Sequence, residues 1–304
     1  MYIQQAQKGL NDWWRYLVTI LLVFAAQFLG SIPLGVVVAM NSSSQSELSE
    51  FQSTYNAEAL GISQNMGLII MLAPMVLTFF TLIIAMRFLH GHSLINVFTS
   101  FNPFRWKNFF FAFTFWGILL VTADLVSYRL NPENYVFSFE PQNFYPLLII
   151  AIFLIPLQAG AEELYFRGNL FQGIGILFHS RTAAFLITSI LFGLMHFGNP
   201  EVKEFGFGIS MSYYIGFGLL MGLLVLLDGG LEMPLAIHAI NNIYGAVFVG
   251  YSGSVLQTPT LFKLKEYDSV AMLILFICSS VFFILLGRKV FKWKMFKDEV
   301  VSDS

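Results

Sequence analysis

The chain has little of what soluble proteins use to stay folded and dissolved. Charged residues make up only 11% of its 304 residues, and Cys278 is its one cysteine. A single cysteine excludes a disulfide framework and a thiolate metal site. No long linker, low-complexity tract or inverted internal repeat interrupts the sequence. These absences favour one uninterrupted domain over residues 1–304.

What remains is strongly apolar. Hydrophobic residues make up 57% of the chain and the mean hydropathy is +0.70, far outside the range of soluble domains. The sequence therefore predicts an all-α, polytopic transmembrane helical bundle of about eight spans. The first is read as an anchor and not as a cleaved signal. The segments long enough to cross a hydrocarbon core of about 30 Å are Leu17–Met40, Met66–Met86, Phe109–Val126, Pro146–Phe178, Ala183–Phe197, Met211–Leu227, Met233–Val249 and Val270–Leu286.

Positive charge is distributed unevenly between alternate loops. A net charge of −2 gives no sign of nucleic acid as a partner. One side of the predicted bundle carries only Arg129, Lys203, Lys263 and Lys265. The other side carries both termini and Lys8, Arg15, Arg87, Arg105, Lys107, Arg181, Arg288, Lys289, Lys292, Lys294 and Lys297. This bias predicts a multi-pass protein of a bacterial plasma membrane with both termini in the cytoplasm.

Two acids and an arginine interrupt the fourth apolar segment. Adjacent residues of a helix point about 100° apart, so Glu162 and Glu163 cannot share one task. Arg167 follows Glu163 by four residues, the spacing that lets the two charges pair within the helix. Glu162 is then the acid without a partner. Because charge inside a membrane is costly, we expect Glu162 to have a functional role.

Two histidines and an asparagine lie in other apolar segments. Glu162 is 18 residues before Ser180 and His196 is 16 residues after it, so both lie about 24–27 Å from the turn between their helices and are expected to face each other. His238 and Asn242 are one helical turn apart and can address the same volume. Their approach to Glu162 requires helices that tilt or project beyond the membrane.

Five further residues receive ordinary structural interpretations. His90, His92 and His179 fall in loops and are expected on the solvated surface. Cys278 is expected to be a small, packed core residue. Asp124 lies near the outer end of the third span, where an interfacial position is favoured over a role in a cavity.

The buried polar groups together indicate hydrolysis. A carboxylate and an imidazole can hold and deprotonate a water, while an imidazole and a carboxamide can stabilise an oxyanion. No suitably placed serine or cysteine nucleophile is evident, which favours direct attack by water. One glutamate and two histidines could also bind zinc, but they come from three helices and the H-E-x-x-H spacing is absent.

These residues also resemble a known family. Glu162-Glu163-Leu-Tyr-Phe-Arg167-Gly168, Phe192-Gly-Leu-Met-His196 and His238-Ala-Ile-Asn-Asn242 are similar, in order and separation, to the three motifs of the CPBP family. That family comprises the type II CAAX prenyl endopeptidases and the bacteriocin-processing and immunity proteins, also called Abi proteins. The resemblance covers roughly residues 145–250, which are then expected to form the catalytic core.

The resemblance implies an intramembrane endopeptidase dependent on glutamate. It implies that Glu162 activates water with His196 as its partner, and that Glu163 and Arg167 support the site. His238 and Asn242 resemble the pair that stabilises the oxyanion. The family has long been labelled a metalloprotease; zinc or another divalent metal, if one is used, would be bound by Glu162, His196 and His238.

The expected partners are the lipid bilayer and a peptide or membrane-protein substrate, cleaved near the cytoplasmic face. Prenylated proteins are not expected in a bacterium, so peptide pheromones, bacteriocin leaders or membrane-protein tails are favoured. Two alternatives stay open: a non-catalytic membrane scaffold or bacteriocin immunity protein, and a transporter with a proton relay, which the missing repeats disfavour. The sequence leaves the oligomeric state open.

Overall fold

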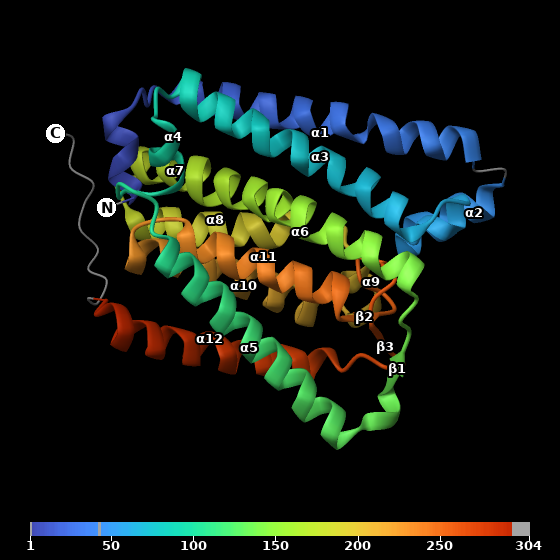
Figure 1. Ribbon diagram of the computed structural model, residues 1–304. Helices are drawn as coiled ribbons and strands as arrows, with labels where there is room; N and C mark the ends of the chain where they lie inside the picture. The colour runs from blue at the N-terminus through green and yellow to red at the C-terminus, as the bar shows by residue number, and fades with distance from the viewer. Residues whose placement is uncertain (1, 42–43, 294–304) are drawn as a thin grey trace.

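The computed structural model describes residues 2–41 and 44–293. Lys294 and Lys297, two of the basic residues that predict the orientation, lie outside the described residues. The start of η1 (Tyr2–Lys8) and the end of α12 lie together at one end of the molecule, here called the terminal end. Three short strands lie toward the opposite end, here called the sheet end (Figure 1).

Six stretches of helix in the described residues are long and apolar enough to cross a membrane. Two shorter helices, α8 (Arg181–Met195) and α11 (Glu232–Val247), complete the eight predicted segments. The chain is therefore a polytopic helical membrane protein, as predicted. The six long stretches are α1 (Trp13–Asn41), α3 (Gln64–Ile84) with η3 (Ala85–Leu89), α5 (Trp106–Leu130), α6 (Pro141–Glu163) with η5 (Leu164–Leu170) and α7 (Phe171–Leu177), α10 (Phe207–Asp228) and α12 (Ser269–Phe291).

The connections contain short helices and a small sheet that the sequence does not predict. The sheet has the order β1-β3-β2, with β1 antiparallel and β2 parallel to β3. It joins β1, which precedes α6, to β3, which precedes α12, and to β2, which follows α11. The remaining elements are α2 (Gln45–Thr54), η2 (Ala57–Leu60), α4 (Leu94–Phe98), η4 (Pro132–Asn134), α9 (Pro200–Phe205), β1 (Tyr135–Phe137), β2 (Val249–Tyr251) and β3 (Phe262–Leu264).

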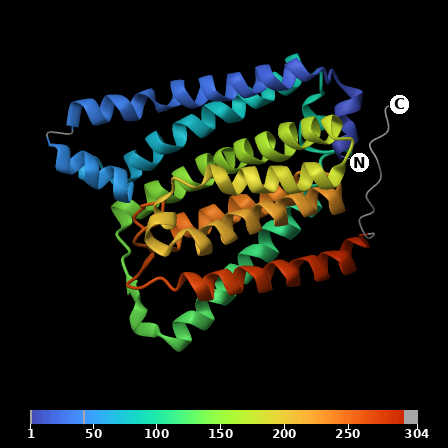
Figure 2. The ribbon, with the colours of Figure 1, turned by 180° about the vertical axis from the view of Figure 1, so that it is seen from behind.

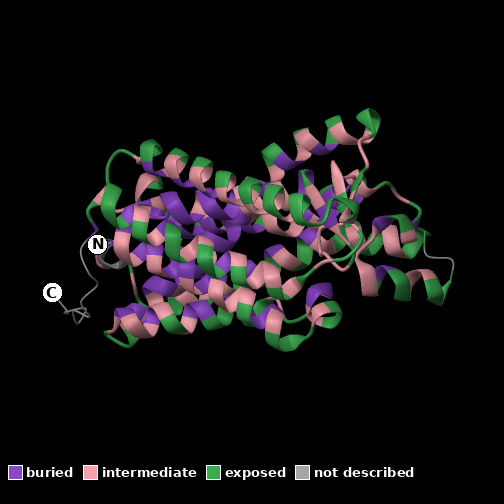
Figure 3. Ribbon diagram, turned by 90° about the horizontal axis from the view of Figure 1, so that it is seen from below, coloured by how far each residue is buried: buried purple, intermediate pink, exposed green. Residues whose placement is uncertain are grey.

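Four helices form the centre of the bundle. The helix that runs from α6 through α7 packs against α11 and α8, and α8 packs closely against α10, which Figure 2 shows from behind. Buried residues gather along these elements, whereas α1, α5 and α12 expose large apolar side chains outward (Figure 3). An apolar outer surface around a polar centre is the pattern expected of a bundle surrounded by lipid.

A buried ion cluster fixes the connection between α10 and α11 at the terminal end. The Arg105 guanidinium donates to Asp228 Oδ2 at 2.7 Å and to Glu232 Oε2 at 2.8 Å. Asn108 and Trp293 donate to the same Asp228 carboxylate. Because Glu232 begins α11, the cluster sets the position of that helix six residues before His238.

Three structural interpretations from the sequence are wrong. His90 and His92 are buried, because the segment before α1 covers their loop and the Leu10 N–H donates to the His90 carbonyl oxygen at 2.7 Å. The Thr19 hydroxyl contacts His90 Nε2 at 2.9 Å. Cys278 is exposed on α12 and not packed in the core, because its face of that helix points outward.

Asp124 links three elements at the sheet end. Its Oδ1 accepts from the Tyr135 hydroxyl of β1 at 2.8 Å, and its Oδ2 accepts from the Tyr244 hydroxyl of α11 at 2.6 Å. Both carboxylate oxygens are therefore satisfied by tyrosines. Asp124 joins α5 to the sheet and to the helix that carries His238.

Candidate active site

The six residues singled out from the sequence converge at the centre of the bundle. Glu162 and Glu163 end α6, and Arg167 lies one turn later in η5. His196 is the capping residue at the end of α8, and α11 supplies the remaining two, His238 and Asn242. Helices separated in sequence thus bring all three motifs together.

Glu162 lies between the two histidines. Its Oε2 atom is 3.8 Å from His196 Nε2 and 3.8 Å from His238 Nε2. These distances exceed a direct hydrogen bond, and Oε2 has no hydrogen-bond partner although it is buried. The other oxygen, Oε1, accepts from Gln158 Nε2. Glu162 therefore has one oxygen positioned by the protein and one directed at the two imidazoles.

Glu163 serves a different purpose, as the 100° separation predicts. Its Oε1 atom accepts from Arg167 Nη1 at 3.0 Å and contacts His238 Nδ1 at 2.7 Å. Glu163 and Arg167 are both fully buried. The expected ion pair is present, and the same carboxylate oxygen also orients a histidine from another helix.

Arg167 joins three helices. Its Nη2 atom donates to the Gly218 carbonyl oxygen of α10 at 3.0 Å, and its guanidinium lies 4.5 Å from the ring centre of Phe192 in α8. The surrounding η5 is a π-helix, in which the Phe171 N–H donates to the Phe166 carbonyl oxygen. Such wide turns occur frequently at functional sites.

The two histidines present the same nitrogen to Glu162. A carboxylate and a carbonyl oxygen are acceptors, so the Nδ1 atoms that contact Glu163 and the Phe192 carbonyl oxygen, the latter at 2.8 Å, are assigned as N–H donors. In the neutral imidazoles Nε2 is then an acceptor. The Tyr214 ring stacks on His196 with ring centres 4.4 Å apart and holds its plane. Three acceptor atoms therefore face one another.

Asn242 reaches Glu162 through a glutamine that the sequence analysis missed. Asn242 Nδ2 donates to Gln158 Oε1 at 2.9 Å, and Gln158 Nε2 donates to Glu162. Gln158 lies one helical turn before Glu162, so a polar residue at that spacing in an apolar helix was the available signal. Asn241 accepts from Trp116 Nε1 at 3.3 Å and donates to the Tyr213 hydroxyl at 3.5 Å.

The donor types near Glu162, one carboxylate and two imidazoles, suit zinc. Zinc ligands from one carboxylate and two imidazoles lie about 2.0–2.2 Å from the metal. Within residues 2–41 and 44–293, no group of three or more histidine, cysteine or acidic side chains has a geometry that could hold a metal ion.

The site lies in the middle of the bundle: Glu162 is 21 residues, about 32 Å, from the start of α6 at the sheet end and 15 residues, about 22 Å, from the end of α7 at the terminal end. Arg181 begins α8 at the terminal end, and His196 lies 15 residues further along, about 22 Å away. Tyr214, which stacks on His196, lies only seven residues, about 10 Å, after the start of α10 at the sheet end. Cytoplasmic termini and cleavage near the cytoplasmic face, both expected from the sequence, therefore both stay predictions.

Comparison with known proteins bears on the same segment. Residues 141–244, from the start of α6 to Tyr244 in α11, match the family model described as type II CAAX prenyl endopeptidase Rce1-like. This range contains all three motifs. Over residues 141–244 the chain is similar to the Rce1-like family. The resemblance stated from the motifs is thereby confirmed for this Rce1-like segment.

One relative matches a longer stretch of the chain than the Rce1-like segment. The uncharacterized protein YyaK of Bacillus subtilis (strain 168) is 31% identical over 185 residues, which are 60% of this chain and 62% of YyaK. The match therefore spans less than two thirds of that relative's length. Because YyaK is uncharacterized, it supplies no activity for comparison.

Proposed function

We propose that the protein is an intramembrane endopeptidase that hydrolyses a peptide bond with water activated by Glu162. One observation carries the proposal. The Oε2 atom of Glu162, which has no hydrogen-bond partner, faces the Nε2 atoms of His196 and His238, each at 3.8 Å. The Rce1-like segment supports the same reaction at the level of the family.

Three facing acceptors are suited to binding a water molecule. Water donates two hydrogen bonds, so it can donate to two of the three atoms and keep a lone pair for the substrate. The polar contacts beyond 3.5 Å around Glu162 are of the length that a bridging water spans. The hydrogen bond from Gln158 and the contact between Glu163 and His238 keep the acceptors in place.

The reaction then proceeds in two proton transfers. Glu162 Oε2 takes a proton from water while the water oxygen forms a bond to the substrate carbonyl carbon, and the carbonyl oxygen gains the negative charge. When the tetrahedral intermediate collapses, the carbon–nitrogen bond breaks and the proton moves from Glu162 to the departing amine. A new carboxyl group and a new amine result, and Glu162 returns to its starting form.

Asn242 is the donor we assign to the oxyanion. One hydrogen of its amide group binds Gln158 Oε1, which leaves the second hydrogen for the substrate. His238 differs from the role implied by the family, because its Nε2 atom faces Glu162 as an acceptor. We propose that His238 helps to hold the water and can donate only after it has gained a proton.

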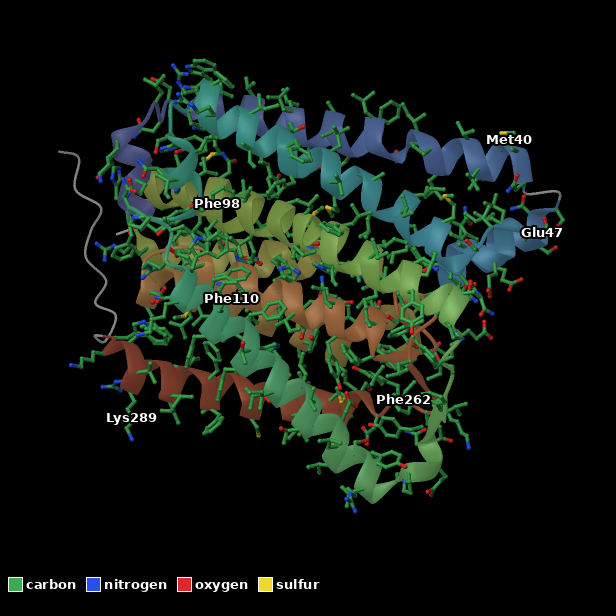
Figure 4. The ribbon with its side chains drawn as sticks, viewed as in Figure 1. Met40, Glu47, Phe98, Phe110, Phe262 and Lys289 are labelled. Carbon is green, nitrogen blue, oxygen red and sulfur yellow. The ribbon has the colours of Figure 1, made fainter. Side chains whose placement is uncertain are left out.

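The substrate is proposed to be a peptide or membrane-protein tail at a bacterial plasma membrane. The basic residues at the terminal end support cytoplasmic termini, and His238 lies six residues after Glu232 of the ion cluster at the same end. Figure 4 shows Lys289 at the terminal end and Glu47 at the far end, in line with this charge distribution.

The deciding experiment compares the membrane and secreted peptides of the native host. Cells would carry wild-type protein or Glu162→Gln at equal levels, since glutamine keeps the size of the side chain and removes the base. We expect a precursor to accumulate, and its product to disappear, only with Glu162→Gln. The exposed acid Glu204, changed to glutamine, is the matched control and should leave the peptides unchanged.

Two results would contradict the proposal. Unchanged peptides in Glu162→Gln cells, together with a phenotype in cells that lack the whole protein, would indicate the scaffold or immunity role. Processing that continues at the wild-type rate in Glu162→Gln would show that another group activates the water.

A further inference from the structure

A small cavity lies beside the catalytic cluster at the sheet end. Its volume is about 90 Å³, and it is enclosed by α9, the first turns of α10, β2 and the start of α12, which meet at this end of the bundle (Figure 1). Its walls contain one carboxylate and four tyrosines, namely Glu201, Tyr213, Tyr214, Tyr251 and Tyr267. None of these residues takes part in the motifs of the active site.

Glu201 is a buried acid with an unsatisfied oxygen. Its exposed fraction is 8%, and its Oε1 atom accepts from the Val255 N–H at 2.8 Å. Its Oε2 atom is buried without a hydrogen-bond partner, and Glu201 forms no ion pair within the described residues. Burial raises the pKa of Glu201, and smaller opposing contributions come from the Val255 N–H and the Tyr214 hydroxyl. A positive charge in the cavity would remove that penalty.

The tyrosines supply the other half of a cation site. Tyr251 and Tyr267 stack with ring centres 3.8 Å apart, and Phe205 lies 4.9 Å from Tyr267. Burial holds the pKa of Tyr251 and Tyr267 above the ordinary value, and the negative charge of Glu201 adds to this effect, so both phenols stay neutral. Aromatic faces around a carboxylate attract cations.

A single side chain, that of Tyr214, separates the cavity from His196. Tyr214 lines the cavity and also stacks on His196, with ring centres 4.4 Å apart. Tyr213 lines it and accepts at its hydroxyl from Asn241, the neighbour of Asn242. A peptide lying across Glu162 could therefore place a nearby side chain between these tyrosines.

We propose that this cavity is a specificity pocket that binds the ammonium group of a substrate lysine next to the cleaved bond. The inference rests on the proposed function, because it assigns the substrate of the same site. Lysine is favoured over arginine because only Glu201 Oε2 is free, and a single acceptor suits a point charge better than the planar guanidinium fork.

The first test measures cleavage by the full protein in lipid nanodiscs of phosphatidylglycerol. The probe is a pool of apolar peptides that contain one lysine, arginine or norleucine, with cleavage sites read by mass spectrometry. We expect cleavage at a fixed distance from lysine, favoured over norleucine on the order of tenfold. The preference should vanish in Glu201→Gln and persist in Glu204→Gln, which changes an exposed acid of the same helix.

The second test measures binding without cleavage. Saturation-transfer NMR would compare the binding of n-butylammonium with that of 1-butanol. Both ligands would be tested on the Glu162→Gln variant and on the double variant Glu162→Gln, Glu201→Gln. Binding of the amine alone, lost with Glu201→Gln, is expected. Tyr267→Leu, which removes an aromatic face and keeps the acid, should weaken it as well.

The outcomes separate this inference from the proposed function. Amine binding that depends on Glu201, with no peptide cleaved, supports the pocket and contradicts the protease. Cleavage without preference for lysine, together with no amine binding, overturns the pocket and leaves the protease. Stronger cleavage beside arginine overturns the choice of lysine. Loss of amine binding when phosphatidylethanolamine replaces phosphatidylglycerol in the nanodiscs identifies a lipid headgroup as the occupant. This result overturns the substrate assignment.

Discussion

At the scale of single residues, the site depends on the Oε1 atom of Glu163, which has two partners. Glu163 Oε1 compensates the Arg167 charge and also fixes the nitrogen that His238 turns toward Glu162. A histidine that binds a carboxylate through one nitrogen has its other nitrogen oriented, as in many hydrolytic and metal sites. Loss of Glu163 is therefore expected to affect both the stability of the fold and the orientation of His238.

We predict that Glu163→Gln lowers the free energy of unfolding by about 3–5 kcal/mol, because Arg167 is then a buried charge without a counter-charge. Thermal unfolding in detergent would measure the loss. Glu163→Gln combined with Arg167→Met is the matched control, since it removes both charges and should recover at least half of the stability. Equal losses in the single and double variants would contradict this account.

A second prediction concerns His90. Burial, with a contribution from the neighbouring His92, lowers the pKa of His90 from 6.5 to about 4. Between those values the unfolded chain binds a proton that the folded protein does not, so stability is complete above about pH 6.5 and falls as the pH is lowered toward about 4. His90→Gln should therefore show a smaller loss of unfolding temperature between about pH 7.5 and about pH 5. An unchanged pH dependence would exclude His90 as the titrating group.

The residue types of the site were predictable, but their partners were not. Charged and polar residues in apolar segments identify Glu162, His196, His238 and Asn242 without any structure. The contact between Glu163 and His238 was not predictable, because it joins helices 75 residues apart and depends on their relative rotation. Burial of His90 was missed for the same reason: its loop is polar in sequence and is covered only by packing.

At the scale of elements, the approach of α8 and α10 positions the catalytic groups. A Cβ atom at Gly218 would lie 2.7 Å from the Ser189 carbonyl oxygen, so only glycine permits this contact. The Gly218 carbonyl oxygen also accepts from Arg167. The spacing of α8 and α10 therefore controls both His196 and the ion pair.

We predict that Gly218→Ala costs about 1–3 kcal/mol of stability and reduces activity, because α8 must move away from α10. Gly208→Ala is the matched control on the same helix, since a Cβ atom there would meet nothing within 4 Å. Unfolding temperature and peptide cleavage would be measured for both. Equal behaviour of the two variants would show that the contact between α8 and α10 tolerates a methyl group.

Sequence analysis predicts the long elements because hydropathy alone defines them. All eight expected segments are helices, with ends shifted by a few residues. The π-helical turn at Leu164–Leu170 was not predicted, since hydropathy does not distinguish a π-helix from an α-helix and the wide turn depends on contacts with α10 and α8. The three-residue strands were missed because they are too short to show a periodic pattern.

At the scale of the whole molecule, the orientation in the membrane decides which compartment reaches the site. We predict that Ser252→Cys at the sheet end reacts with a membrane-impermeant maleimide in intact cells, whereas Ser93→Cys at the terminal end reacts only after permeabilisation. Both serines are exposed, and a Cys278→Ser background removes the natural thiol. The reverse labelling would contradict the charge-based orientation.

The small sheet also has a consequence for the order in which the protein is completed. Phe137 of β1 pairs with Phe262 of β3, about 125 residues further along the chain. A chain that folds as it is synthesised must insert its central helices before this pairing can form. The Rce1-like segment is then already in place when Tyr251 and Tyr267 reach their positions. The catalytic groups thus assemble first, and the part of the cavity wall that contains Tyr251 and Tyr267 forms last.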